Sequence, residues 1–117
     1  MQSVINKDQV LVITNEIMGH GDVELGAILI RSFVHTLSEA KLLPGTIIFY
    51  NTGAKLVVKG STVLEDLKLI QNKGVKILAC GTCLGHFNLK EQIAIGKISN
   101  MYDISDTMLK AAKVINL

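Results

Sequence analysis

Tryptophan is absent from this chain of 117 residues, proline occurs once, and aromatic residues make up only 4 % of it. Domains that bind nucleic acids present basic surfaces and aromatic rings that stack on bases, but this chain has a net charge of only +2. We therefore expect no nucleic acid among its partners. With only two cysteines the chain also has no disulfide framework, and a reducing compartment would keep both as thiols.

The chain also lacks a hydrophobic run that is long and uncharged enough to cross a bilayer, and its first residues do not form a secretory signal. We therefore expect a cytoplasmic protein that does not enter a membrane. The segment GHGD at 19–22 lacks the spacing of a dinucleotide-binding motif, so no cofactor is predicted. The length suits one core, which predicts a single domain over residues 1–117.

Apolar residues form 49 % of the chain, and its mean hydropathy is +0.40. Because aromatics are scarce, the interior must consist of Ile, Leu, Val and Ala, which is typical of a parallel sheet covered by helices on both faces. The surplus of apolar surface for so small a protein favours self-association.

Short β-branched runs predict buried strands at 9–14, 46–51 and 75–79, with a further strand at 96–101. Residues 114–117 are short enough for a fifth strand or a frayed tail. Strands alternate with helical segments, which predicts a three-layer α/β/α sandwich with a parallel sheet and right-handed crossovers.

The longest helix is expected to begin after the N-cap Asp22 and to continue until Pro44 and Gly45 stop it. Its apolar positions cover an arc of roughly 240°, more than a sheet alone would hide, so another subunit is expected to cover the rest. These positions are Leu25, Ile28, Leu29, Ile30, Phe33, Val34 and Leu37.

Three shorter helices are expected further along the chain, each beginning at a residue whose side chain can cap the first turn. The first of them is expected to end at Gly74. Between residues 80 and 88 the chain is expected to form a loop. The predicted caps are Thr62 with Glu65, Asn88 with Glu91, and Ser105 or Asp106.

Loops that leave the carboxyl ends of parallel strands build the functional site in such folds. Here the three loops after the first three strands carry polar residues and both cysteines. The expected substrate-binding residues are Glu16, His20, Asn51, Thr52, Gly81 and Thr82.

Cys80 and Cys83 are the candidate catalytic residues. Cys80 leaves a buried strand into Gly81, which lets backbone N–H groups turn toward the sulfur, and a nearby helix N-terminus would favour the thiolate. Cys83 is close enough to form a disulfide or to accept a sulfur atom from Cys80. The pattern favours reactive thiol chemistry with Cys80 as the principal nucleophile.

Other interpretations of these residues remain open. Cys80 is also of a residue type that often simply packs in a core. Zinc would accept Cys80, Cys83 and His86 with His20, but the chain has no second CxxC motif, so no metal is predicted. Near the sulfur, His20 would orient a substrate or stabilise the thiolate, and Glu16 would donate a proton.

The chain contains ACGTCL at the end of the third expected strand, GKISNMYDI downstream, and ELG at the start of the first helix. With the segments around them, these motifs resemble the DsrE-like family over nearly the whole chain. The resemblance is to its YedF-like branch, which is associated with selenium metabolism and described as sulfurtransferase-like. It implies a five-stranded parallel sheet and a homo-oligomer, a trimer or hexamer.

In sulfur-relay relatives a cysteine after the third strand carries a persulfide. That residue matches Cys80, and Cys83 matches the additional thiol of the YedF-like branch. YedF-like proteins usually have a TusA-like carrier domain ahead of this one, and this chain begins almost at its first strand. The resemblance therefore implies that such a carrier is a separate partner or that the sequence is a fragment.

The leading hypothesis is a sulfur or selenium transfer protein. The Cys80 thiolate would take a sulfane sulfur from a donor protein and pass it to an acceptor thiol, with Cys83 as a possible first acceptor. The alternatives are a non-catalytic oligomeric module that binds a small ligand or metal, and a thiol-disulfide oxidoreductase that uses both cysteines.

Overall fold

The computed structural model describes residues 3–117. In chain order its elements are β1 (Val4–Ile13), α1 (Val23–Ser38), β2 (Leu42–Phe49), the 3₁₀ helix η1 (Asn51–Val57), α2 (Leu64–Asn72), β3 (Lys76–Cys80), α3 (Gly81–His86), the 3₁₀ turn η2 (Lys90–Gln92), β4 (Lys97–Ser99), α4 (Met101–Lys110) and β5 (Lys113–Asn116). Within this described part of the chain, no helix is long and apolar enough to span a membrane.

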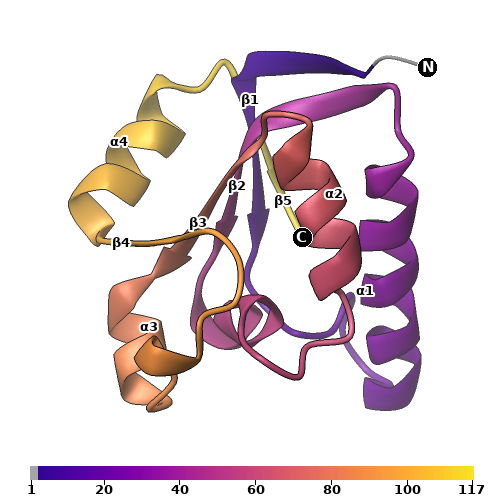
Figure 1. Ribbon diagram of the computed structural model, residues 1–117, viewed down its shortest axis with the longest axis vertical. Coiled ribbons are helices and arrows are strands. Elements are labelled where there is room, and N and C mark those ends of the chain that lie inside the picture. The colour runs from indigo at the N-terminus through magenta and orange to yellow at the C-terminus, as the bar shows by residue number, and fades with distance from the viewer. Residues whose placement is uncertain (1–2) are drawn as a thin grey trace.

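The five strands form one sheet in the order β4-β3-β2-β1-β5, and every pairing is parallel. This confirms the expected parallel sheet and makes the last segment a fifth strand. The chain moves in one direction across the sheet from β1 to β3, but from β4 to β5 it crosses back. Because crossovers are right-handed, α1 and α2 cover one face and α4 covers the other, which gives the predicted three layers (Figure 1).

Two apolar clusters lie on the two faces of the sheet. The larger cluster fills the space between the sheet and the layer of α1, α2 and η1. The smaller cluster lies on the α4 side, where alternate strand residues point. Its buried members are Val10, Val12, Ile48, Cys80 and Ile104.

The first helix begins as expected and ends earlier than expected. The Asp22 side chain accepts a hydrogen bond of 2.8 Å from the backbone N–H of Leu25. The helix ends at Ser38, and Pro44, expected to stop it, lies inside β2. At Pro44 β2 pairs with β1 alone, because pairing with β3 begins at Thr46. The missing N–H of the proline therefore interrupts no pairing with β3.

The exposed side of α1 confirms that the sheet does not hide its whole apolar arc. Leu25, Ile28 and Leu29 are 52 %, 48 % and 41 % exposed, whereas Ile30 and Val34 are buried against the sheet. With Val23, the first residue of the helix, four large apolar side chains of α1 therefore remain exposed.

The predicted cap residues of the later helices are wrong. The helix α2 begins at Leu64 without a side-chain cap, and Ser61 accepts a hydrogen bond from Val63 just before it, so Thr62 and Glu65 form no capping box. The helix α4 begins at Met101, directly after the short strand β4, and its first turn is capped by Asn100. The sequence therefore indicated that these helices exist but misplaced their first turns.

Ser105 and Asp106, the expected caps of the last helix, lie within α4 instead. Asn88 also has a different role from the one predicted. Its φ of 57° is left-handed and its N–H donates to the carbonyl of Gly85, so it closes the end of α3. Glu91 lies within η2, which has no side-chain cap.

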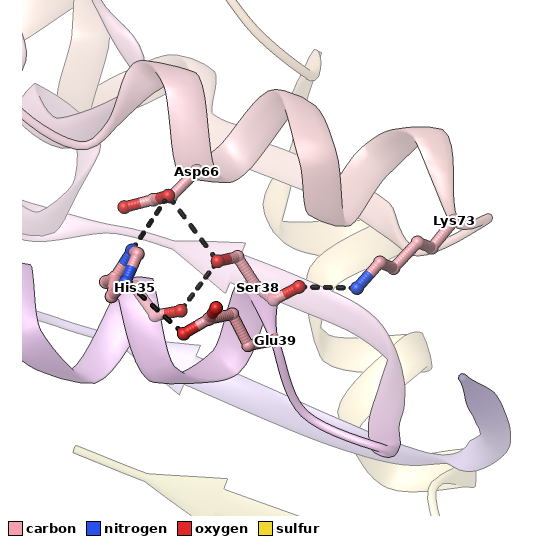
Figure 2. Close-up of polar contacts among 5 residues, drawn as sticks. All are labelled: His35, Ser38, Glu39, Asp66 and Lys73. Carbon is pink, nitrogen blue, oxygen red and sulfur yellow. Dashed lines mark hydrogen bonds and ion pairs between the residues drawn. The ribbon is translucent and has the colours of Figure 1, made fainter. Parts of the chain in front are cut away.

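Polar side chains join α1 to α2 at the outer surface (Figure 2). The Asp66 carboxylate lies 3.3 Å from Nδ1 of His35, and it also accepts a hydrogen bond of 3.4 Å from Ser38. The same Ser38 O–H is shared with the carbonyl of His35, which lies closer at 2.6 Å, and the Lys73 ammonium donates to the carbonyl of Ser38. These contacts satisfy carbonyl groups in the last turn of α1.

Candidate functional site

The register of the three central strands brings their ends to one edge of the sheet. Ile13 pairs with Phe49, and Phe49 pairs with Ala79. The chain therefore leaves β1, β2 and β3 at the same level, at the edge where α3 lies in Figure 1. This is the edge at which the sequence places the candidate site.

The segment after β3 is a short helix, not the expected loop. Cys80 is the last residue of β3 and the N-cap of α3, which begins at Gly81. A Cβ atom on Gly81 would lie 3.1 Å from the Ile98 side chain and 3.1 Å from the carbonyl of Ser99. Glycine therefore lets the first turn of α3 lie directly against β4.

Cys80 is buried, with 2 % of its surface exposed. It packs in the smaller cluster with Val12, Ile48 and Ile104. Although it occupies the N-cap position, its side chain makes no capping hydrogen bond. The thiol predicted to be the principal nucleophile therefore faces the layer of α4, away from solvent.

Cys83 is the more accessible of the two thiols. It is half-buried, and its Sγ accepts a hydrogen bond of 3.1 Å from the backbone N–H of Asn51. Burial raises the pKa of Cys83, the hydrogen bond from Asn51 lowers it, and the neighbouring Cys80 thiol raises it, with a net upward shift. Near neutral pH, Cys83 is therefore mainly a thiol whose sulfur is already oriented by a backbone donor.

A chain of hydrogen bonds connects the first loop to this sulfur. The Thr52 hydroxyl donates to Oδ1 of Asn15 at 3.1 Å and accepts a long hydrogen bond of 3.4 Å from the N–H of Glu16. The Thr52 N–H in turn donates to Oδ1 of Asn51 at 2.8 Å. The predicted residues Glu16, Asn51 and Thr52 therefore lie together, and Asn51 links them to Cys83.

Gly53 fixes the position of η1, a role that no sequence pattern indicated. A Cβ atom at this residue would lie 2.2 Å from the carbonyl oxygen of Ile13. Only a glycine allows η1 to cross so closely over the end of β1. The N–H of Asn51, two residues earlier, is held toward Cys83 by this close packing.

A pocket of about 290 Å³ opens beside Cys83. Phe87 forms part of its wall and stacks edge-to-face with His86, and the Lys55 ammonium lies 4.6 Å from the Phe87 ring centroid. His86 also lines the pocket. The sequence indicated this residue only as a candidate zinc ligand, because it follows Cys83 by three residues. The lining residues are Asn51, Thr82, Cys83, His86 and Phe87.

Of the six predicted substrate-binding residues, Asn51 and Thr82 line this pocket and the other four do not. Thr52 adjoins it through the hydrogen bond to Asn51, and Gly81 is buried at the start of α3. His20 is exposed in the loop between β1 and α1, and Glu16 lines a different hollow together with Lys55 and Lys59. Among residues 3–117, no group of three or more His, Cys, Asp or Glu side chains is arranged to hold a metal ion. The structure therefore does not assemble the four zinc ligands that the sequence allowed.

The sequence and the fold are both similar to those of known proteins. The model of the DsrE/DsrF-like family matches residues 10–117. The chain belongs to this family. DsrE-like proteins are associated with sulfur metabolism and sulfur transfer. A comparison with curated proteins gives no match.

Several solved structures have the same fold. The ychN protein from E. coli has 16 % sequence identity and a TM-score of 0.61, with 100 % of both chains covered. MTH1491 from Methanobacterium thermoautotrophicum has 18 % identity and a TM-score of 0.67, with 96 % of this chain and 100 % of that one covered. BT1422 from Bacteroides thetaiotaomicron has 14 % identity and a TM-score of 0.63, with 94 % and 95 % covered. At these identities the likeness establishes the DsrE-like fold alone.

Substitution of Gly53 by alanine tests the close packing of η1. We expect Gly53→Ala to lower the free energy of unfolding by about 1–3 kcal/mol, because the added methyl group meets a backbone carbonyl that has no room to move. Chemical denaturation measures this. The control is Gly85→Ala, whose Cβ would meet only the flexible end of Lys90, so it should be neutral or slightly stabilising. Equal stability of the two variants would contradict the conclusion that the position of Gly53 has no room for a side chain.

Alkylation distinguishes the two thiols. In the folded protein we expect iodoacetamide to modify Cys83 and to leave Cys80 unmodified until denaturant is added, because Cys80 is buried. The rate at Cys83 should rise with pH and reach half its maximum above the pKa of about 8.5 of a free cysteine. Peptide mass spectrometry across a pH series measures both effects. Modification of Cys80 first, or a midpoint below that of free cysteine, would be inconsistent with this geometry.

Proposed function

We propose that this protein carries sulfur, or selenium, as a persulfide at the Cys80 and Cys83 pair. One observation carries the proposal: a half-buried Cys83 thiol lies in an open pocket, accepts a backbone hydrogen bond from Asn51, and adjoins a second, buried thiol. Membership of a family associated with sulfur transfer supports it. Two free thiols also suit a reducing, cytoplasmic compartment.

In the proposed first step, the Cys83 thiolate attacks the terminal sulfur of a donor persulfide. A bond forms between Sγ of Cys83 and that sulfur, and the sulfur-sulfur bond of the donor breaks. The donor leaves as a thiolate and takes up the proton that Cys83 gave to solvent. The protein then holds the sulfur as a Cys83 persulfide, which an acceptor thiolate attacks in the same manner.

The raised pKa of Cys83 suits a carrier that stays unreactive until a donor is present. The thiolate fraction is small near neutral pH, so nonspecific alkylation and oxidation are slow. When the thiolate forms, the N–H of Asn51 is already directed at the sulfur and stabilises the new charge. Thr82 and His86 line the opening through which the donor approaches.

The sequence-based hypothesis placed the persulfide on Cys80, and this stays a prediction. Accessibility favours Cys83 as the thiol that a donor reaches first, because Cys80 is 2 % exposed. Both versions use the same pair of residues. They differ in which sulfur receives the incoming atom.

Loading with glutathione persulfide tests the proposal. We expect intact-mass spectrometry to show one added sulfur atom on the wild-type protein and on Cys80→Ala, and none on Cys83→Ser. Cys83→Ser retains a small polar group in the pocket, so it serves as the matched control for access. Circular dichroism confirms that each variant is folded.

Loading of Cys83→Ser but not of Cys80→Ala would place the persulfide on Cys80, as the sequence predicts. Failure of all three proteins to gain sulfur would overturn the proposed carrier function.

We also propose that the exposed side of α1 packs against a second copy of this chain. Leu25, Ile28 and Leu29 form a continuous apolar surface there. The size of the apolar arc predicted a covering subunit, and the resemblance to DsrE-like proteins implies an oligomer. A second copy of this chain agrees with both the wide apolar arc and the resemblance, so we propose it as the partner of this surface.

Replacement of Ile28 by glutamate tests this interface. We expect Ile28→Glu to lower the molar mass in solution to that of the monomer, because a carboxylate would have to be buried in an apolar contact. Light scattering after size-exclusion chromatography measures the mass. Leu69→Glu, at a similarly exposed position of α2, is the control and should leave the assembly intact. A wild-type monomer, or an unchanged oligomer of Ile28→Glu, would exclude α1 as the contact.

A further inference from the structure

The two thiols occupy positions at the start of α3 that lie next to each other. Cys80 is the N-cap, and Cys83 is the third residue of the helix. At a helix start, the N-cap side chain lies against the backbone of this third residue. Cys83 packs against the smaller cluster, which contains Cys80, and the neighbouring Cys80 thiol contributes to the raised pKa of Cys83. Cys80 is therefore adjacent to the sulfur that meets the donor, although solvent does not reach Cys80 itself.

A disulfide between these residues needs Cβ atoms about 3.5–4.5 Å apart. Cys80, with an extended backbone (φ −67°, ψ 120°), comes directly before the helix, and Cys83 lies in its first turn. Because α3 has only six residues and Cys83 is half-buried, a rotation of the Cys83 side chain away from the N–H of Asn51 would bring the two sulfurs together.

We propose that Cys80 is a resolving cysteine that releases the carried sulfur as hydrosulfide. This inference depends on the proposed function, because it begins from a persulfide on Cys83. The outer sulfur of that persulfide extends into the pocket, while Sγ of Cys83 stays beside Cys80. Cys80 therefore lies next to the inner sulfur, and an external acceptor meets the outer one.

In the release step the Cys80 thiolate, whose proton has passed to solvent, attacks Sγ of Cys83. The bond between Sγ and the outer sulfur breaks, and the outer sulfur leaves with the bonding electron pair as HS⁻. A disulfide joins Cys80 and Cys83. The sulfane sulfur is reduced to sulfide while the two cysteines are oxidised, so the step needs no external oxidant.

A sulfur atom loaded on Cys83 can therefore leave the site in two ways. An acceptor thiolate that reaches the pocket takes the outer sulfur and leaves both cysteines reduced. Without an acceptor, Cys80 releases sulfide and leaves a disulfide, which an external dithiol must reduce before the next cycle. Burial of Cys80 restricts it to this internal reaction, because donors and acceptors cannot reach it.

The experiment loads the wild-type protein with glutathione persulfide, removes small thiols by rapid desalting, and follows two products with time. Monobromobimane measures released sulfide, and intact mass under acid quench measures the disulfide by the loss of two hydrogen atoms. We expect one disulfide to form for each sulfide released. In Cys80→Ala we expect sulfide release to be at least about tenfold slower and the added sulfur to stay on Cys83.

The outcomes separate this inference from the proposed function. If neither the wild type nor Cys80→Ala gains sulfur, and the wild type forms no disulfide and releases no sulfide, the carrier proposal fails, and the resolving role fails with it. If the wild type gains sulfur but releases sulfide without a disulfide, or as slowly as Cys80→Ala, the resolving role is wrong while the carrier proposal stands. Because the disulfide is measured on the wild type, a folding defect of Cys80→Ala does not affect this conclusion.

Discussion

The parallel register of β1, β2 and β3 is the constraint on which the candidate site depends. It aligns Ile13, Phe49 and Ala79 in one row, so β1, β2 and β3 end within one residue of the same level. Side chains alternate between the two faces of a sheet, so a slip of one residue in β3 would move Cys80 from the α4 side to the side of α1 and α2. The large apolar side chains on both faces resist such a slip.

From this register follows the unequal access of the two thiols. Cys80 is still a strand residue and points into the cluster beneath α4, while Cys83 lies on a helix that has turned away from the sheet. The close contact of Gly53 with Ile13 then brings the N–H of Asn51 to the second sulfur. A buried thiol and an oriented, accessible thiol thus result from backbone geometry.

The sequence was sufficient for the fold because period-two and period-3.6 patterns report burial, which governs strands and helices over several residues. It also placed both cysteines at the carboxyl end of the third strand, although the segment that follows is the helix α3 and not a loop. The cap residue Ser105 was misassigned because Asn100, an equally good acceptor nearby, caps α4 instead. Thr62 was misassigned because Ser61 accepts the N–H of Val63 just before α2, which begins without a side-chain cap. The burial of Cys80 and the role of Gly53 were not predictable, because both depend on contacts with segments distant in sequence.

Ile104 covers Cys80 from α4, near the end of the chain, and β5 completes the sheet by pairing with β1. During synthesis on the ribosome, the amino-terminal half emerges first, and α3 is complete before α4 exists. The cover over Cys80 is therefore added last. A nascent chain that stalls before α4 has both cysteines open to the surrounding fluid, and oxidants or metal ions in the cell reach the thiol that the finished protein encloses.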